Sequence, residues 1–193
     1  MTSNVLPPYR VTVETKEAES NFADLSEATK NDMLFVKPPY LKCDWLYFWN
    51  DADFDCEAII KLSFKGKILG LIRFALYPFD DPPVSPEFLE ISHIECVSKD
   101  SRIANPVGFW LIWYACKVSI SHCTAQDDED LVKLDALESA IDYYENKVRM
   151  EGLGWTSHYR TGEDVYAFRF TRESAQRFCT TIEQEYGFPV LHR

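Results

Sequence analysis

Hydrophobic and polar residues follow regular spacings along most of this chain, and these spacings predict where strands and helices lie. Strict alternation predicts strands at residues 9–16 (YRVTVETK) and 88–97 (FLEISHIECV). Two largely apolar runs, residues 58–64 and 68–77, flank a Lys-Gly-Lys turn at residues 65–67 and predict an antiparallel hairpin. Within 88–97 the alternation predicts one face made of Leu89, Ile91, His93 and Glu95, and a second made of Phe88, Glu90, Ser92 and Ile94.

Helical spacing of apolar residues marks four further segments, at residues 20–35, 106–123, 139–149 and 172–186. The first opens with Ser20, a favourable N-cap, and the last ends before Gly187. Shorter strands are predicted at residues 131–137 and 165–170, with a terminal candidate at residues 188–191. Four segments are expected to be irregular: the aromatic-rich residues 38–55, the Pro-rich acidic residues 78–87, the acidic residues 126–130, and GLGW at residues 152–155.

The order of these elements restricts the fold class. The strands at residues 88–97 and 131–137 are joined by a helix, so they are expected to be parallel in a right-handed βαβ unit. The hairpin before them is antiparallel, which predicts a mixed α/β sheet that is antiparallel at one end and has one parallel crossover. No internal repeat, low-complexity tract or linker interrupts the pattern, so we expect one α/β domain over residues 1–193.

Composition and charge exclude some classes of partner. The chain has 193 residues, is 46% hydrophobic and carries a formal net charge of −11, so it can bury a core, and its excess of anions disfavours nucleic acid as a partner. No segment reaches the roughly 18 apolar residues of a membrane span, and the N-terminus does not read as a signal peptide. A cytoplasmic location with reduced thiols is therefore expected.

Cysteine and histidine positions give no pattern typical of a metal site. The six cysteines and four histidines are scattered without a Cys-x-x-Cys pair. His122 and Cys123 are neighbours in sequence, but no second pair supports them as zinc ligands. We expect no bound metal.

The stretch SRIANPVGFW, residues 101–110, marks the start of the apolar helix. Asn105 is a favoured N-cap, and Pro106 suits the first helical position because its missing N–H has no helical partner there. The first turn of a helix presents unpaired N–H groups along the macrodipole, which makes it a site for anions. This stretch is therefore either a capped turn or a phosphate-binding site.

The order of strand, Arg-containing loop, apolar helix, strand and Tyr-Glu helix resembles the GNAT superfamily of acyl-CoA-dependent N-acyltransferases. The family's phosphate loop follows a strand that ends in Val and contains an Arg or Gln, two further residues, a Gly, one residue, and then a Gly or Ala before the helix. Val97 and Arg102 match the strand end and the Arg. Asn105 falls at the first loop Gly, and Gly108 lies one residue after the second.

A second segment extends the resemblance. The sequence AIDYYENKV, followed by Gly154-Trp155, is similar to the family's Tyr-Glu-Lys helix and the Gly-aromatic step after it. The resemblance covers roughly residues 9–156, and residues 157–193 fit as a variant C-terminal ending. The loop departs from the family because Ile103 and Asn105 carry side chains where backbone must approach phosphate.

The resemblance implies a co-substrate and roles for particular residues. Acetyl-CoA or another acyl-CoA would lie with its pyrophosphate at the helix start and its pantetheine arm between the two splayed parallel strands. Tyr144 matches the family's general acid, which protonates the departing thiolate. The motif does not identify the base that takes the proton of the amine, for which Glu95 and Glu90 are candidates and His93 is a third.

Two functions from different classes are consistent with these features. The first is an acyl-CoA-dependent N-acetyltransferase whose acceptor is a small-molecule amine or a basic protein, since the acidic balance favours a cationic acceptor such as a polyamine, an aminoglycoside or a Lys-rich protein. The second is a catalytically inactive protein of the same fold that acts as an acidic interaction or inhibitor module. The sequence does not indicate the acyl group, the acceptor or the oligomeric state.

Overall fold

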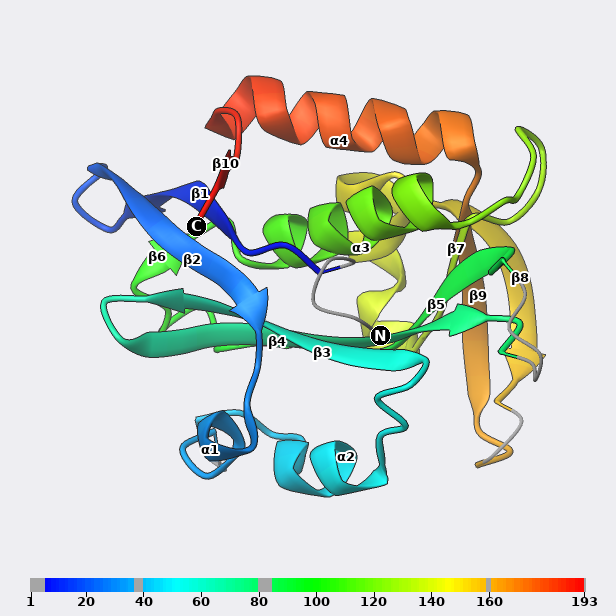
Figure 1. The fold of residues 1–193 in the computed structure, drawn as a ribbon, viewed down its shortest axis with the longest axis horizontal. Helices are drawn as coiled ribbons and strands as arrows, with labels where there is room; N and C mark the ends of the chain where they lie inside the picture. Colours follow the sequence, from blue (N-terminus) through cyan, green and yellow to red (C-terminus); the bar gives the residue numbers. More distant parts are fainter. Residues whose placement is uncertain (1–5, 37–39, 80–84, 159–160, 193) are drawn as a thin grey trace.

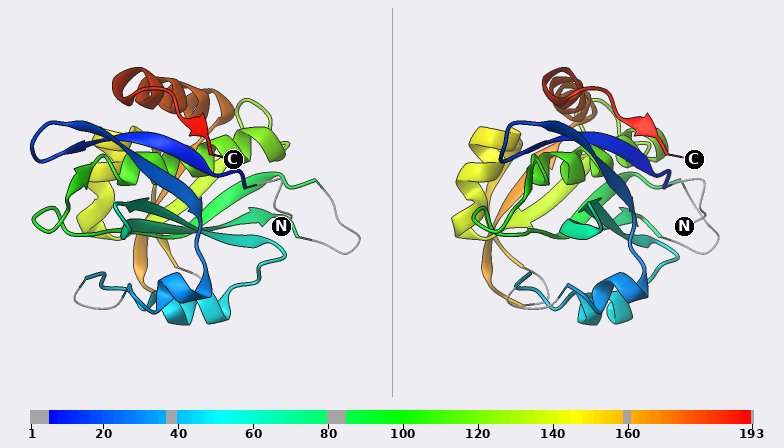
Figure 2. Two further views of the ribbon diagram at one scale, coloured as in Figure 1. Left: turned by 60° about the vertical axis from the view of Figure 1, so that its left-hand side comes forward. Right: turned by 90° about the vertical axis from the view of Figure 1, so that its left-hand side faces the viewer.

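One strongly twisted sheet runs through the molecule, with helices on both of its faces (Figures 1 and 2). The computed structural model describes residues 6–36, 40–79, 85–158 and 161–192. The described residues form a ten-stranded sheet in the order β10-β1-β2-β3-β4-β5-β7-β9-β8, with β6 paired to β1. The strands are β1 (Tyr9–Thr15), β2 (Ser20–Glu27), β3 (Glu57–Phe64), β4 (Lys67–Tyr77), β5 (Phe88–Cys96), β6 (Ala104–Asn105), β7 (Val132–Ala136), β8 (Glu151–Ser157), β9 (Asp164–Phe170) and β10 (Val190–Leu191).

The helices divide between the two faces of the sheet. The α-helices are α1 (Lys30–Met33), α2 (Trp45–Asp51), α3 (Gly108–His122) and α4 (Arg172–Tyr186), and a 3₁₀-helix η1 (Glu138–Ala140) precedes a π-helix η2 (Tyr143–Val148). α3 and α4 cover one face, and α1 and α2 cover the other (Figure 1). The expected mixed α/β class is confirmed.

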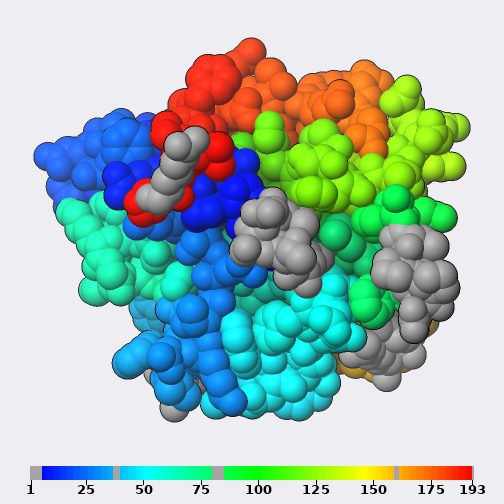
Figure 3. Space-filling view, viewed as in Figure 1, coloured from blue at the N-terminus to red at the C-terminus, as the bar shows by residue number. Residues whose placement is uncertain are grey.

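The main core lies between the sheet and α3. Three large side chains of α3, Trp110, Trp113 and Tyr114, are fully buried there. α4 lies along the outer side of α3 (Figure 1), and its orange atoms border the yellow-green ones of α3 on the molecular surface (Figure 3). Phe178 and Ile182 of α4 belong to the same cluster. Because α3 is enclosed by the sheet on one side and by α4 on the other, nearly its whole surface is apolar.

β5 and β7 form the parallel pair that the order of elements predicted. Their register joins Leu89 to Val132, Glu90 to Lys133 and Ile91 to Leu134, and the described residues show no further pairing between the two strands. β9 and β8 continue the sheet beyond β7 in an antiparallel sense and run steeply across the direction of β3 and β4 (Figure 1). The two parts of the sheet therefore separate at β5 and β7.

A β-bulge in β5 corrects the predicted division of its faces. Arg73 of β4 is paired with His93, whereas the next residue of β4 is paired with Ile91, so Ser92 is the extra residue. An extra residue shifts the side-chain alternation by one position. Leu89 and Ile91 consequently face the main core, while His93 and Glu95 face the opposite side rather than sharing their face.

The helix predicted from Ser20 is wrong, because residues 20–27 form β2. This segment pairs with β1 on one side and with β3 on the other. Ala23 and Leu25 are buried with a spacing of two, and Phe22, which fitted the helical spacing, is 65% exposed. The short α1 begins after Thr29, whose side chain accepts a hydrogen bond from the backbone N–H of Asp32.

The predicted N-cap of α3 is also wrong. Asn105 belongs to β6 and pairs with Glu14 of β1, so the chain is still extended at that residue. α3 begins at Gly108 after Val107, which makes no side-chain capping bond. Strand pairing and a hydrogen bond from the Arg102 Nη1 to Asn105 Oδ1 therefore hold Asn105 outside the helix.

The remaining predictions are mostly confirmed, with two differences. The hairpin of β3 and β4, the strands β7 and β9, the terminal strand β10 and the end of α4 at Gly187 lie where the spacing predicted. The expected helix at residues 139–149 is instead divided into η1 and η2, and GLGW lies inside strand β8 rather than breaking the chain.

The two long segments expected to be irregular have different outcomes. Residues 45–51 of the aromatic-rich segment form α2, which begins after Asp44. Residues 80–84 of the Pro-rich loop lie outside the described residues. Among the described residues, no helix is both long enough and apolar enough to cross a membrane.

Candidate functional site

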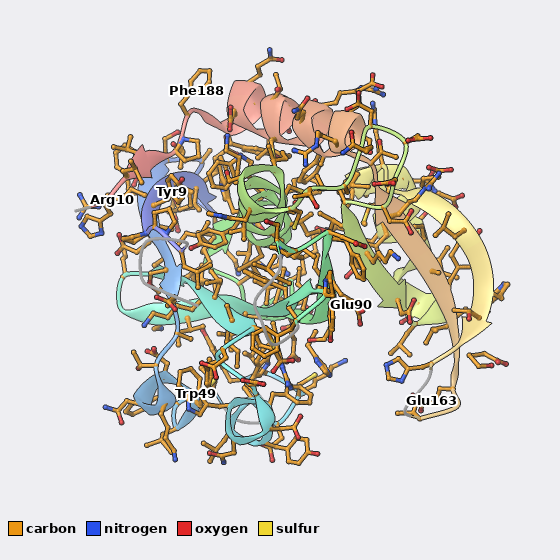
Figure 4. The ribbon with its side chains drawn as sticks, turned by 45° about the vertical axis from the view of Figure 1, so that its right-hand side comes forward. Tyr9, Arg10, Trp49, Glu90, Glu163 and Phe188 are labelled. Atoms are coloured by element: carbon orange, nitrogen blue, oxygen red, sulfur yellow. The ribbon has the colours of Figure 1, made fainter. Side chains whose placement is uncertain are left out.

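A cleft of about 390 Å³ opens where β5 and β7 separate. Its walls come from β3, β4, β5, β7, the segment that contains η1 and η2, and the tip of the β8–β9 hairpin. Apolar side chains such as Ile94 and Leu134 share the lining with the carboxylates of Glu90, Asp135 and Glu163. Figure 4 shows Glu90 in the sheet and Glu163 at the far end of the hairpin. Residues that are distant in sequence therefore meet at this opening.

Tyr144 of η2 lies in the inner wall of the cleft. Its side chain is buried, and its ring lies 5.7 Å from that of Phe168 of β9 between centroids. Burial raises the pKa of the Tyr144 hydroxyl above its usual value, because the charged phenolate would lose its hydration. The hydroxyl consequently stays protonated at neutral pH and can act as a hydrogen-bond or proton donor.

The bulge at Ser92 places three candidate bases on the same face of β5. Glu90 precedes the bulge, and His93 and Glu95 follow it, so the added residue brings all three to the side opposite α3. Glu90 and His93 line the cleft. The His93 ring lies against Phe48 of α2, with 3.8 Å between ring centroids.

Glu95 is bound by the segment that leads into α2. Its Oε1 accepts a hydrogen bond from the backbone N–H of Lys42 at 2.5 Å. Its Oε2 accepts from the backbone N–H of Cys43 at 3.1 Å and from the Trp45 Nε1–H at 2.9 Å. The carboxylate therefore joins β5 to the 42–45 segment, and both of its oxygens already accept hydrogen bonds from the protein.

Arg73 of β4 lies buried at the floor of the cleft. Its side chain is 5% exposed, and its Nη2 donates to Glu57 Oε2 at 2.7 Å and to Asp51 Oδ2 at 3.4 Å. The positive charge of Arg73 is thus balanced inside the protein. Among the described residues, the cleft lining holds four carboxylates against this one guanidinium, so the cleft is acidic.

Arg102 organises the loop before α3. Its Nε and Nη2 both donate to the backbone oxygen of Val97, at 3.0 Å and 2.9 Å, and its Nη1 donates to Asn105 Oδ1 at 3.0 Å. Arg102 therefore contacts two of the other predicted cofactor-binding residues, Val97 and Asn105. In this arrangement the guanidinium fixes the shape of the loop by bonds within the protein.

Tyr143 covers the start of α3. A β-carbon added to Gly108 would lie 2.5 Å from the Tyr143 hydroxyl oxygen and 3.7 Å from the Cys96 sulfur. The Tyr143 ring stacks on Phe109, with 6.0 Å between centroids and 15° between planes. Burial raises the pKa of this hydroxyl as well. A side chain of the protein therefore lies against Gly108 at the helix start, where the resemblance implies a phosphate.

Comparison with known proteins gives similarity in structure alone. No family model and no curated protein sequence matches this chain. An uncharacterized protein from Bacillus halodurans superposes with a TM-score of 0.59 at 8% identity, over 95% of this chain and 99% of that one.

Two further similar structures are of proteins whose activity or family is known. The aminoglycoside acetyltransferase AAC(6')-Ib, solved with coenzyme A and kanamycin, has a TM-score of 0.53 at 10% identity, over 80% of this chain and 98% of that one. The GNAT domain of PAT from S. lividans has a TM-score of 0.53 at 12% identity, over 89% and 99%. The chain has the GNAT fold. At these identities the likeness establishes the arrangement of the chain, and the chemistry must be argued from its own residues.

The cleft and the loop of this GNAT fold differ in how well they suit an acyl-CoA. The cleft offers apolar walls at Ile94 and Leu134 and strand ends on β5 and β7 that the sheet does not pair with each other, as a narrow arm with amide groups requires. In the loop, Arg102 is bonded within the protein, Pro106 has no N–H, and Tyr143 covers Gly108. The cleft therefore has apolar lining and unpaired strand edges, whereas the loop residues Arg102 and Gly108 are in contact with other groups of the protein.

Sequence analysis missed several residues of the site. Arg73, Asp135 and Glu163 line the cleft but belong to no motif, and the strand separation that unites them is a tertiary feature. Tyr143 was passed over in favour of its neighbour Tyr144. The signal that could have identified it is the Tyr-Tyr pair itself, since adjacent residues of a helix point in different directions.

Proposed function

We propose that the protein is an acyl-CoA-dependent N-acyltransferase whose acceptor is a cationic amine bound in the cleft between β5 and β7. The observation that carries the proposal is the separation of these two strands after Ile91 and Leu134, beside the buried Tyr144 hydroxyl. The separation opens the cleft between the facing edges of the two strands, and the Tyr144 hydroxyl is a proton donor in its wall.

Tyr144 and Glu90 have the two proton-transfer roles in this proposal. When bound, acyl-CoA supplies a thioester carbonyl that is already activated. Tyr144, kept neutral by burial, donates the proton that a departing thiolate needs. Glu90, which lines the cleft, takes the proton that the amine must lose. Both side chains act from fixed elements, which keeps their positions defined.

Glu95 has a positioning role instead of the base role in this proposal. Its three accepted hydrogen bonds hold Lys42, Cys43 and Trp45 against β5, and Cys43 is itself part of the cleft wall. Arg102 with Val97 and Asn105 sets the path of the loop into α3. Removal of the Glu95 carboxylate would therefore alter the cleft wall, and removal of the Arg102 guanidinium would alter the loop. Neither group transfers a proton in this proposal.

The charge of the cleft favours a cationic acceptor. Glu90, Asp135 and Glu163 lie on three different elements around the opening, and the whole chain carries a net charge of −11. Like charges on the walls of a cleft raise the local concentration of oppositely charged ligands. An amine that is protonated in solution is thus attracted before a base removes its proton.

An assay of thiol release with a panel of amines tests this proposal. The panel contains spermidine, kanamycin and a Lys-rich peptide, each with acetyl-CoA and with a neutral amide as the control acceptor. We expect release of CoA thiol with at least one cation and a fall of about 10²-fold in Tyr144→Phe. No thiol release above hydrolysis with any amine, from protein that is folded, would contradict it.

A second candidate function is a non-catalytic interaction module, and the covered start of α3 favours it. The Tyr143 hydroxyl takes the place beside Gly108 where a phosphate would approach the helix. In that case the acidic surface would bind a basic protein and acetyl-CoA would not bind at all. A thermal-shift measurement with millimolar acetyl-CoA separates the two functions, since only the enzyme is stabilised by it.

A further inference from the structure

β8 forms one edge of the sheet, at the end opposite β10 (Figure 1). β9 pairs with it on one side, and no strand among the described residues pairs with it on the other. Six of its seven residues are exposed, and Gly154 is half-buried. An unpaired edge presents a row of backbone N–H and C=O groups to which a further strand can bind. The edge of β8 is therefore accessible along the whole strand.

Two large apolar side chains of β8 are exposed, Leu153 by 50% and Trp155 by 57%. Leu153 is the extra residue of the bulge between Gly152 and Gly154, so it has no counterpart on β9. The Trp155 ring meets the Tyr166 ring of β9 edge to face, with 5.6 Å between centroids. This contact holds the indole on the sheet while more than half of its side chain remains in solvent. Exposed apolar side chains beside an unpaired strand edge are typical of an association site.

The opposite edge of the sheet is better protected against such pairing than β8. Short edge strands, Pro, Lys and bulges are the features that usually prevent a second strand from binding. β10 has only two residues, Val190 and Leu191, and Pro189 precedes it. β8 has seven residues and contains neither Pro nor Lys, so the bulge at Leu153 is its one feature of this kind. The edge that can accept a partner strand is thus that of β8.

The charge of β8 favours a second copy of this chain as the partner. The chain carries a net charge of −11, so two copies repel each other over most of their surfaces. β8 has no charged side chain from Gly152 to Ser157. Its one carboxylate, Glu151, is paired with Arg169 of β9 at 2.8 Å. The strand is therefore a neutral strip along which two acidic chains can meet.

The order of residues in β8 is also complementary to itself. In an antiparallel pair of two β8 strands centred on Gly154, Leu153 lies opposite Trp155 of the second copy. The same register sets Glu151 opposite Ser157, so no like charges face each other. Cross-strand pairs of an aromatic and an aliphatic side chain stabilise a sheet, and the two-fold symmetry makes each pair occur twice.

We infer that β8 is the interface through which two copies of this chain form a symmetric dimer, with their sheets joined edge to edge. The unpaired edge supplies backbone hydrogen bonds, and Leu153 and Trp155 supply the apolar contact. This inference goes beyond the proposed function and does not rest on it. The edge is a product of the fold, so the dimer is expected of an acyltransferase and of a non-catalytic interaction module alike.

Sedimentation velocity of the full chain, at concentrations from about 1 to about 100 μM, measures the dimerisation. The variants Leu153→Lys and Trp155→Lys each place a charge in the neutral strip at an exposed position. Phe188→Lys is the matched control, because Phe188 is a 73% exposed aromatic residue that lies next to β10 at the other edge. Hydrogen exchange of the unaltered chain at the two ends of the concentration range locates the contact and requires no substitution. Thermal unfolding confirms that each variant is folded.

We expect a species of twice the mass of the chain to predominate at the upper concentration. The dimer of each β8 variant should be weaker by about tenfold or more, and that of Phe188→Lys unchanged. The backbone amides of residues 151–157 should exchange more slowly at the upper concentration. A chain that stays monomeric throughout, or a dimer that both β8 variants form with unaltered affinity, would overturn the inference. Protection that rises with concentration only outside β8 would also overturn it, since the copies would then meet at another surface.

Discussion

The hydroxyl of Tyr143 lies so close to Gly108 that a β-carbon at residue 108 would be 2.5 Å from its oxygen. The absence of a side chain at Gly108 thus permits a tyrosine of η2 to approach the first turn of α3. The same contact covers the helix start with a group of the protein itself. The Tyr143 ring in turn stacks on Phe109 of α3 and lies 5.3 Å from that of Tyr144, which lines the cleft.

Gly108→Ala is expected to destabilise the protein through Tyr143. An Ala in place of Gly in a helix ordinarily adds up to about 1 kcal/mol of stability, whereas overpacking of a buried contact costs about 1–3 kcal/mol. The double variant with Tyr143→Phe should recover most of the loss, because the ring carbon would be 3.5 Å from the new methyl group. Urea unfolding of both single variants and the double variant measures this coupling. Additive effects would show that the two residues do not interact as described.

Tyr144→Phe is expected to reduce turnover without unfolding the protein. Loss of one hydroxyl should change the free energy of unfolding by about 1 kcal/mol or less, whereas loss of the proton donor should lower kcat about 10²-fold. The matched control is Tyr143→Phe, which removes a neighbouring buried hydroxyl that does not line the cleft. A larger loss of kcat in the control than in Tyr144→Phe would assign the donor role to Tyr143.

Glu90→Gln and Glu95→Gln are expected to have different effects. Glu95→Gln weakens three hydrogen bonds to the 42–45 segment, so its free energy of unfolding should fall by about 1–3 kcal/mol. Glu90→Gln should leave stability nearly unchanged and lower kcat at neutral pH. Unfolding curves and kcat for both variants give the comparison. The positioning role of Glu95 is refuted if the Gln variant is as stable as the parent and inactive.

The stability of the β7–β9 region is expected to depend on pH through Asp130. Partial burial opposes its ionisation, but hydrogen bonds from Arg169 and Lys133 prevail and hold the pKa of Asp130 below its ordinary value of 3.8. Because the pKa of Asp130 is lower in the folded chain than in the unfolded chain, its ionised carboxylate stabilises the fold at pH values above the unfolded-state pKa. This stabilisation is lost as the pH falls through the folded-state pKa. Asp130→Asn should therefore lose less stability below pH 3.8 than the parent does. Asp127→Asn, in the same loop, is the control, and identical acid unfolding of all three proteins would exclude this contribution.

The order of elements was predictable because each strong local signal agreed with the tertiary pairing. The hairpin of β3 and β4 and the capped helix α4 are fixed by residues near in sequence. The β2 segment was misassigned because Phe22, Leu25 and Ala28 fit a helix, while pairing with β1 and β3 favours the strand. Local spacing cannot report such non-local hydrogen bonds.

The candidate site was predictable in its location and less so in its contacts. Tyr144 and Glu90 line the cleft, whereas Glu95 is bonded to the 42–45 segment, and the roles that the resemblance implied for them stay predictions. The extra residue Ser92 leaves no mark on the sequence, yet it decides which side chains face the cleft. The internal bonds of Arg102 depend on the path of the loop, which no residue pattern specifies.

The measurement that tests the central claim most directly is the thermal unfolding of the full chain with and without acetyl-CoA. If acyl-CoA is the co-substrate, a concentration of about 100 times its Kd should stabilise the fold by roughly 2.7 kcal/mol and raise the Tm. Tyr143→Ala, which uncovers Gly108 at the start of α3, should be stabilised at least as strongly. An unchanged Tm at millimolar acetyl-CoA in both proteins, with no heat on titration, would contradict the proposal that this GNAT fold is an acyltransferase.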